Sequence, residues 1–155
     1  YKIINMKTLS IILLTFILYS CGYTPMFSSN SQTRINVEEL IITGDRELNN
    51  FIKEKIDRLD NKSSTKKVSI TVSTSYSKET LTKDKSGNTT QYKLNANVNF
   101  IIKTEKSTEE INLSESSSMN NFSDEFEQKN YERSTKDQFS SIFINQLIIS
   151  LSRIE

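Results

Sequence analysis

Two long stretches of the chain alternate between apolar and polar residues, which is the pattern of strands with one buried and one wet face. One stretch covers about 66–81, and the other begins at Tyr92 and ends at Ile102. Their apolar positions are even-numbered except for Leu81 and Ile101: Val68, Ile70, Val72, Tyr76, Tyr92, Leu94, Ala96, Val98, Phe100 and Ile102. A polar segment around Ser86-Gly87-Asn88 separates the two stretches and favours a turn. The pattern therefore predicts a long antiparallel hairpin with its turn near Gly87.

Two other stretches follow the spacing of a helix. Apolar residues recur at three- and four-residue steps over Arg46–Leu59, and Asp45 has a side chain suited to capping the start of this helix. A second helix is expected to begin near 123–127 and to end at Arg153. The residues that follow helical spacing from 131 onward are Tyr131, Thr135, Phe139, Ile142, Phe143, Leu147, Leu151 and Ile154. Both helices should therefore bury one side against other elements.

Weaker signals complete the order of elements. Residues 35–42 indicate a strand before the first helix. Ile111 and Leu113 indicate a weaker strand after a turn at 105–108. The fold class is then α+β, in the order β-α-β-β-β-α, with two helices packed on one face of a small, mostly antiparallel sheet. Residues 35–155 form one domain by length. The residues expected in its core are Ile52, Ile56, Val98, Phe100, Ile142 and Phe143.

The N-terminal region has the features of a bacterial export signal. Lys7 precedes an almost unbroken apolar run over 9–18, which is the length of the apolar part of a signal peptide and too short for a membrane span of about 20 residues. The run ends in Leu18-Tyr19-Ser20-Cys21, which resembles the lipobox of bacterial lipoproteins. We therefore expect a lipoprotein signal peptide over 1–20 and a lipidated N-terminus with a tether over 21–34. A plain secretory signal is the alternative.

Cys21 is the only cysteine of the chain, so it has no partner for an internal disulfide. In bacterial lipoproteins this cysteine carries a covalent diacylglycerol and an N-acyl lipid. One acyl chain holds a protein to a membrane only marginally, whereas two or more hold it stably. Gly22 follows the cysteine, and a residue other than aspartate there resembles the pattern released to the outer membrane of Gram-negative bacteria. The resemblance implies an outer-membrane protein that is lipid-anchored at Cys21 and faces the periplasm.

Composition argues against several classes of function. The 20 lysines and arginines nearly balance the 19 aspartates and glutamates, so no basic excess favours nucleic acid as a partner. Histidine, the commonest general base at neutral pH, is absent from the sequence. The acidic pairs Glu38/Glu39 and Glu109/Glu110 occupy neighbouring strand positions, whose side chains point to opposite faces. We therefore expect no enzymatic activity, no catalytic residue, no metal site and no cofactor besides the lipid.

Four lysines gather around the predicted hairpin turn: Lys78, Lys83, Lys85 and Lys93. Lysine is the usual residue for keeping strand edges soluble and unpaired, which is the first interpretation. The second is contact with anionic head groups, for which an ammonium acts as a point charge. The sequence pattern alone leaves both interpretations open.

The chain resembles the LPS-assembly lipoprotein LptE family over nearly its whole length. The lipobox followed at once by CGYTPMF resembles the start of that family. GDRELNNFIKEKIDRL, SGNTTQYKLNANVNFII and NYERSTKDQFSSIFINQLIISLSRI are similar, in order, to its first helix, central hairpin and long C-terminal helix. The C-terminal helix departs from the family pattern, because Ser, Phe, Ile and Asn stand where alanines are common.

The resemblance implies a partner and a function. LptE is an outer-membrane lipoprotein that sits inside the LptD β-barrel, assists its folding and helps to pass lipopolysaccharide to the outer leaflet, without catalysis. Lys83, Lys85 and Lys93 then become candidate lipopolysaccharide contacts, because lipopolysaccharide carries phosphates and sugar acids. A free-standing periplasmic lipoprotein that binds a small ligand or a peptidoglycan component is the alternative, and it would need a pocket.

Overall fold

The computed structural model describes residues 34–153, so the predicted signal peptide, Cys21 and most of the tether lie outside the described residues. The elements follow one another as predicted: β1 (Asn36–Thr43), α2 (Arg46–Leu59), β2 (Lys67–Lys83), β3 (Thr89–Lys103), β4 (Thr108–Asn120) and α3 (Glu125–Arg153). No helix in this part of the chain combines the length and the apolar character that crossing a bilayer requires.

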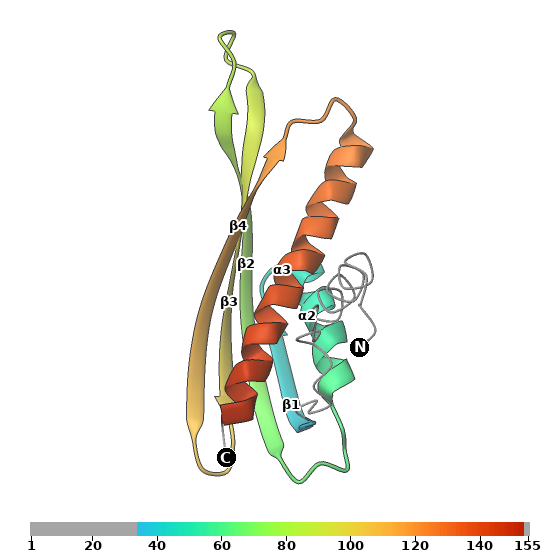
Figure 1. Ribbon diagram of the computed structural model, residues 1–155, viewed down its shortest axis with the longest axis vertical. Helices are drawn as coiled ribbons and strands as arrows, with labels where there is room; N and C mark the ends of the chain where they lie inside the picture. Colours follow the sequence, from blue (N-terminus) through green and yellow to red (C-terminus); the bar gives the residue numbers. More distant parts are fainter. Residues whose placement is uncertain (1–33, 154–155) are drawn as a thin grey trace, which may run out of the picture. The chain divides into compact units, whose positions relative to one another are not determined.

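The four strands form one sheet in the order β1-β2-β3-β4. β1 runs parallel to β2, and the β2–β3 and β3–β4 pairs are antiparallel. Both helices lie on one face of this sheet (Figure 1). The predicted α+β class, with two helices on one face of a mostly antiparallel sheet, is confirmed.

The cross-strand register brings the even-numbered side chains of β2 and β3 together under the helices. Val72 lies opposite Phe100, and Phe100 lies opposite Ile111 of β4. Val72 and Phe100 are fully buried. The core continues on the same face through Val68, Ile70, Leu94, Ala96, Val98, Ile102 and Met119. The period of two therefore placed the buried face of the hairpin correctly.

α2 begins and ends where its spacing predicted. The Asp45 carboxylate accepts a hydrogen bond from the Leu48 amide at 2.8 Å, which satisfies one of the free N–H groups of the first turn. Leu48, Ile52 and Ile56 are fully buried and form the apolar side of the helix.

The link between β1 and α2 requires a glycine. Gly44 has a φ of +109°, a backbone conformation that side chains with a Cβ rarely adopt. A Cβ added there would lie 1.9 Å from the Thr74 carbonyl oxygen of β2. The close approach lets the Thr74 hydroxyl accept a hydrogen bond from the Asp45 amide at 3.0 Å, so the turn is tied to the sheet.

The buried side of α3 differs in part from the prediction. Phe139, Phe143, Leu147 and Leu151 are buried as their spacing indicated. The expected core residue Ile142 is only partly buried, and Ile144, on the other flank of Phe143, is buried in its place. Ile144 shares an i, i+4 row with Lys136 and Ser140, and Lys136 contacts Asp45 at the start of α2. The position of α2 therefore decides which flank of α3 is covered.

β4 is longer than its weak sequence signal indicated, because it continues through a serine-rich segment to Asn120. Met119 near its end is buried and lies opposite Tyr92 of β3. Asparagine is depleted in strands and serine is not among the residues that favour them, so pairing with β3 and not local preference sets this length.

Candidate functional site

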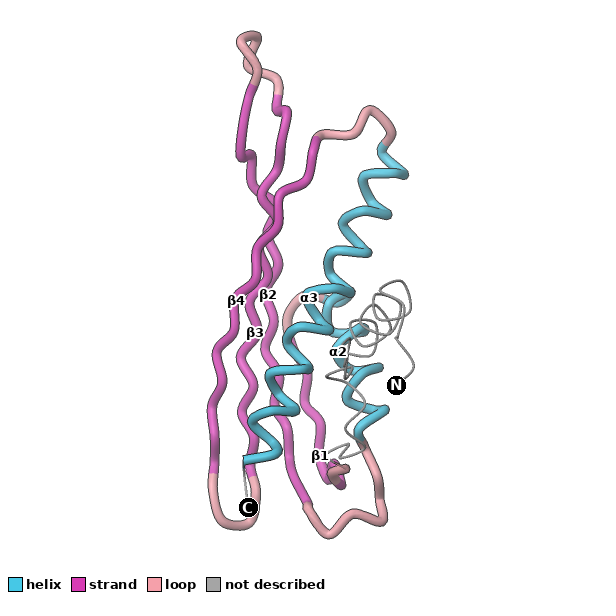
Figure 2. The backbone as a smooth tube through the Cα atoms, in the orientation of Figure 1, coloured by secondary structure: helices cyan, strands magenta, loops and turns pink. Residues whose placement is uncertain are grey.

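The β2–β3 turn stands clear of the rest of the sheet, beyond the last pair between β3 and β4 (Figure 2). The Asp84 carboxylate organises this turn by accepting hydrogen bonds from the amides of Ser86 at 2.8 Å and Asn88 at 2.9 Å. The Asn88 amide is the main cause that lowers the pKa of Asp84. Gly87 supplies the positive φ, +86°, that closes the turn.

Lys83 and Lys85 flank Asp84 at this tip, and both are exposed. Lys93 is also exposed, but it lies further down β3 with Glu79 as its cross-strand neighbour. It stands between Tyr92 and Leu94, whose side chains face the helices, so it points to the opposite side of the sheet. The structure brings Lys83 and Lys85 together and keeps Lys93 apart from them.

Lys78 has a structural role. Its ammonium lies 2.6 Å from the Glu132 carboxylate of α3 and 4.9 Å from the centre of the Tyr92 ring. Its side chain is 30% exposed, and that of Glu132 is 19% exposed. Lys78 therefore joins β2 to α3 and does not belong to the surface at the hairpin tip.

A polar cluster around the buried Lys136 joins α2, β2 and α3. Lys136 is the most buried lysine described, with a side chain that is only 10% exposed. Its ammonium lies 3.2 Å from both carboxylate oxygens of Asp45, 3.2 Å from the Glu47 carboxylate and 4.1 Å from the centre of the Tyr76 ring. Burial, and then the Glu132 carboxylate, raise the pKa of Tyr76. Every charge in this cluster has a partner of opposite sign, so the arrangement holds the three elements together.

The sequence pattern does not single out this cluster. One signal was present, because Lys136 follows Thr135 and precedes Phe139 by three residues, which places it at the border of the apolar stripe. Among residues 34–153, no group of acidic, cysteine or histidine side chains is arranged to hold a metal ion.

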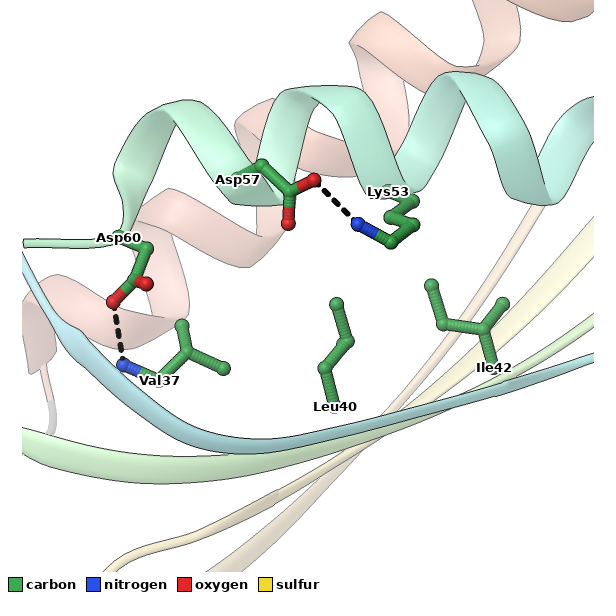
Figure 3. Close-up of a pocket in the computed structure, with 6 residues that line it drawn as sticks. All are labelled: Val37, Leu40, Ile42, Lys53, Asp57 and Asp60. Atoms are coloured by element: carbon green, nitrogen blue, oxygen red, sulfur yellow. Dashed lines mark hydrogen bonds and ion pairs between the residues drawn. The ribbon is translucent and has the colours of Figure 1, made fainter.

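A groove of about 340 Å³ lies between β1 and α2 (Figure 3). Val37, Leu40 and Ile42 of β1 form its apolar floor. Its rim carries Lys53, Asp57 and Asp60. Its volume lies at the lower end of the range of small-ligand pockets, about 300–1,000 Å³. The groove could accept a small apolar group.

The charged rim of this groove is already paired. The Lys53 ammonium lies 2.5 Å from the Asp57 carboxylate. Asp60 accepts a hydrogen bond from the Val37 amide at 2.9 Å, and this bond is the main cause that lowers the pKa of Asp60. Lys62 donates to the Val37 carbonyl oxygen at 2.7 Å. Asp60 and Lys62 thus occupy the backbone groups of β1 at Val37, which would otherwise be open to another strand.

A second, shallower hollow of about 400 Å³ lies on the face of the sheet opposite the helices. The outward-facing side chains that line it are Ser73, Ser75, Asn97, Asn99, Asn112 and Ser114. All of them are uncharged and small. Asn97 donates to the Ser75 hydroxyl at 3.2 Å and Asn99 to the Asn112 side chain at 2.7 Å, so neighbouring strands are linked across this face.

The chain resembles solved lipoprotein structures in its fold. No family model matches the chain, and no curated protein matches it in sequence. Rare lipoprotein B from Shewanella oneidensis superposes with a TM-score of 0.58 at 12% identity, over 75% of this chain and 98% of that one. A minor lipoprotein from Acinetobacter baumannii superposes with a TM-score of 0.50 at 16% identity, over 72% of this chain and 93% of that one.

Residues 34–153 therefore share the fold of these two lipoprotein structures. More particularly, the chain has the fold of rare lipoprotein B, and this fits the LPS-assembly lipoprotein family that its sequence resembles.

Proposed function

We propose that this chain is a lipid-anchored lipoprotein of the outer membrane. It partners and plugs an LptD-like β-barrel, assists the assembly of that barrel and helps to insert lipopolysaccharide into the outer leaflet. One observation carries the proposal: a lipobox ending in Cys21 precedes a domain with the rare lipoprotein B fold. The proposed function is binding and needs no catalytic residue.

The anchor is tested by the mass of the mature chain isolated from its native host. We expect an N-terminal Cys21 that carries three acyl chains. Such an anchor does not leave a bilayer on a working timescale. Cys21→Ser should abolish the added mass and leave the precursor uncleaved. An unmodified N-terminus in the wild-type protein would contradict the lipoprotein assignment.

The partner is tested by purification from detergent-solubilised outer membrane. The full-length, lipidated chain should recover a β-barrel protein whose electrophoretic mobility changes on heating. Depletion of the chain should lower the amount of that barrel in its assembled form and weaken the barrier against large hydrophobic antibiotics. Normal barrel assembly and normal antibiotic resistance in a null strain would contradict the proposed function.

Lys83 and Lys85 are the proposed contacts with the phosphates and sugar acids of lipopolysaccharide. They lie side by side in sequence around Asp84 at the exposed tip. Lys93 stays a candidate contact, but on the face of the sheet away from the helices, so it would meet a different part of the ligand.

The groove between β1 and α2 supports the second candidate, a free-standing periplasmic lipoprotein with a small ligand. Its apolar floor and volume of about 340 Å³ would suit a small, largely apolar group. Leu40→Trp should fill the groove and abolish binding of such a ligand without affecting recovery of a barrel. Loss of barrel recovery in this variant would favour the barrel contact over the small-ligand function.

A further inference from the structure

The long C-terminal helix α3 is supported by the core along only part of its length. All of its buried residues lie between Thr135 and Leu151, and none of residues 125–134 is buried. Phe126 in its first turn is 71% exposed, and Tyr131 is also exposed. Helices in proteins gain most of their stability from packing of an apolar side against other elements. The first turns of α3 lack this support.

A few contacts join the first turns of α3 to the sheet. The Glu132 carboxylate lies 2.6 Å from the Lys78 ammonium of β2. The Tyr131 hydroxyl donates a hydrogen bond to the Ser118 carbonyl oxygen of β4 at 3.3 Å. The Tyr131 ring also lies 5.6 Å from the ring of Phe122, in the link between β4 and α3. The ion pair and the hydrogen bond are partly exposed to water, so each of them is weak.

The boundary between the two parts of α3 lies at Thr135. The Thr135 hydroxyl donates to the Tyr131 carbonyl oxygen at 2.9 Å, a contact that often bends helices. Ser134 and Thr135 also rank below the good helix formers. The next residue, Lys136, is held by both carboxylate oxygens of Asp45 at 3.2 Å. The helix is therefore fixed from Lys136 onward, and Thr135 is the place where it can bend.

The first turns of α3 and the link before them cover one end of the core. Met119 near the end of β4 is buried and lies opposite Tyr92 of β3. Phe122 packs against the same core, and its ring meets that of Tyr131. The cover of this end thus depends on two aromatic rings, and no buried side chain of residues 125–134 adds to it.

We propose that residues 121–134, which we call the strap, open from the sheet as one unit while the rest of the domain stays folded. The strap bends at Thr135, and its fasteners are the ion pair of Glu132 and the hydrogen bond of Tyr131. Its opening exposes Met119 to water. Local opening of this kind is typical of segments that have few buried apolar contacts. The inference does not depend on the proposed function, since it concerns only contacts within the domain.

Amide hydrogen exchange measures this opening in the full-length chain purified in detergent. Mass spectrometry of proteolytic fragments compares residues 129–134 with residues 139–147, because the first four amides of a helix have no partner within it. We expect 129–134 to exchange about a hundredfold faster or more, since they open locally whereas 139–147 require unfolding of the core. Equal protection of the two segments would overturn the inference.

One substitution at a fastener shows whether the strap opens as proposed. Glu132→Gln removes the charge that faces β2, so it should speed exchange of 129–134 several-fold and leave 139–147 unchanged. The control Lys129→Gln breaks an exposed ion pair with Glu125 inside the strap and should change exchange of 129–134 by less than about twofold. Equal effects of the two variants would overturn the inference. So would an acceleration by Glu132→Gln that is uniform along α3.

A thiol placed under the strap gives an independent measurement. Met119→Cys should react with a water-soluble maleimide at the rate at which the strap opens, and Glu132→Gln should raise this rate several-fold. Val98→Cys, which is buried in the middle of β3, should react far more slowly and should not respond to Glu132→Gln. The chain without an added thiol gives the contribution of Cys21. Equal reaction rates at 119 and 98 would mean that only global unfolding exposes Met119, and the inference would fail.

Discussion

Lys136 and Asp45 are 91 residues apart in sequence, yet the Lys136 ammonium lies 3.2 Å from both carboxylate oxygens of Asp45. The same carboxylate caps α2 by accepting from the Leu48 amide at 2.8 Å. One side chain therefore both starts α2 and joins it to α3. The contact lies beside Tyr76 of β2, so it also fixes both helices to the sheet.

Replacing Asp45 should separate its two roles. Asp45→Asn keeps a good capping group but removes the charge that faces Lys136, and we expect it to lower the free energy of unfolding by about 1 kcal/mol. Asp45→Ala also removes the cap and should cost about 2 kcal/mol. Urea unfolding of the soluble domain measures both values. The control is Asp124→Ala, which removes the exposed carboxylate that accepts from the Phe126 amide at 2.7 Å and should cost about 1 kcal/mol or less.

The two glycines with positive φ should respond differently to alanine. Gly44→Ala should cost more than about 2 kcal/mol, because the added Cβ would lie 1.9 Å from the Thr74 carbonyl oxygen and the φ of +109° is unfavourable. Gly87→Ala meets no atom within 4 Å and should cost about 1 kcal/mol from its backbone conformation alone. Thermal unfolding should rank the variants in this order, and equal costs would mean that the β1–α2 turn yields easily.

The two flanks of α3 should differ in their tolerance of truncation. Ile144→Ala should cost about 2–4 kcal/mol, because Ile144 is only 5% exposed and packs in the core. Ile142→Ala should cost less than about 1 kcal/mol, since Ile142 is only partly buried. Phe100→Ala, at the centre of the sheet, should cost about 3–5 kcal/mol and serves as the upper reference. A larger effect at Ile142 than at Ile144 would show that α3 is rotated about its axis.

Asp60 should contribute stability in a defined range of pH. The hydrogen bond from the Val37 amide lowers its pKa below the ordinary value of 3.8. A lowered pKa in the folded state gives stability that is present above the unfolded pKa and is lost as pH falls through the folded one. Asp60→Asn should therefore cost about 0.5–1 kcal/mol at neutral pH, and the difference from the wild type should shrink as pH falls below 3.8 and through the lowered pKa of the folded state.

Denaturant unfolding at several pH values measures this difference. The control is Asp57→Asn, which removes an exposed ion pair with Lys53 and should have a smaller effect at neutral pH. A difference between the wild type and Asp60→Asn that persists unchanged in acid would mean that the charge of Asp60 does not stabilise the fold.

The lysines at the hairpin tip should affect lipopolysaccharide binding and not folding. Replacing Lys83 and Lys85 by glutamine should lower the affinity of the purified, anchor-free domain several-fold, since each exposed charge contact is worth about 1 kcal/mol or less. The loss should be larger at low salt, because 0.1 M salt screens charges over about 10 Å. Lys103 and Lys106, exposed at the other end of β3, give the matched double replacement, which should bind as the wild type does. Equal affinity of all three proteins at low salt would return Lys83 and Lys85 to the role of keeping the strand edge soluble.

Local signals in the sequence determined the elements of this protein. The three- and four-residue spacing over Arg46–Leu59, with Asp45 before it, predicted α2 with the bounds that the structure has. The alternation after Lys67 and from Tyr92 to Ile102 predicted which faces of β2 and β3 are buried. These signals are reliable because helix and strand periodicity depend on neighbours along the chain. The proposed anchor at Cys21 also comes from sequence and lies outside the described residues.

Only the tertiary structure decided which charges are buried and which surfaces are left in water. Lys136 belongs to the buried side of α3 because Asp45 and Glu47 of the α2 region meet it there. Lys78 leaves the surface cluster because Glu132 of α3 lies over β2. Ile144 replaces Ile142 in the core because α2 covers that flank of α3. These outcomes depend on contacts between segments that are far apart in the chain, and such contacts leave no periodic signal in the sequence.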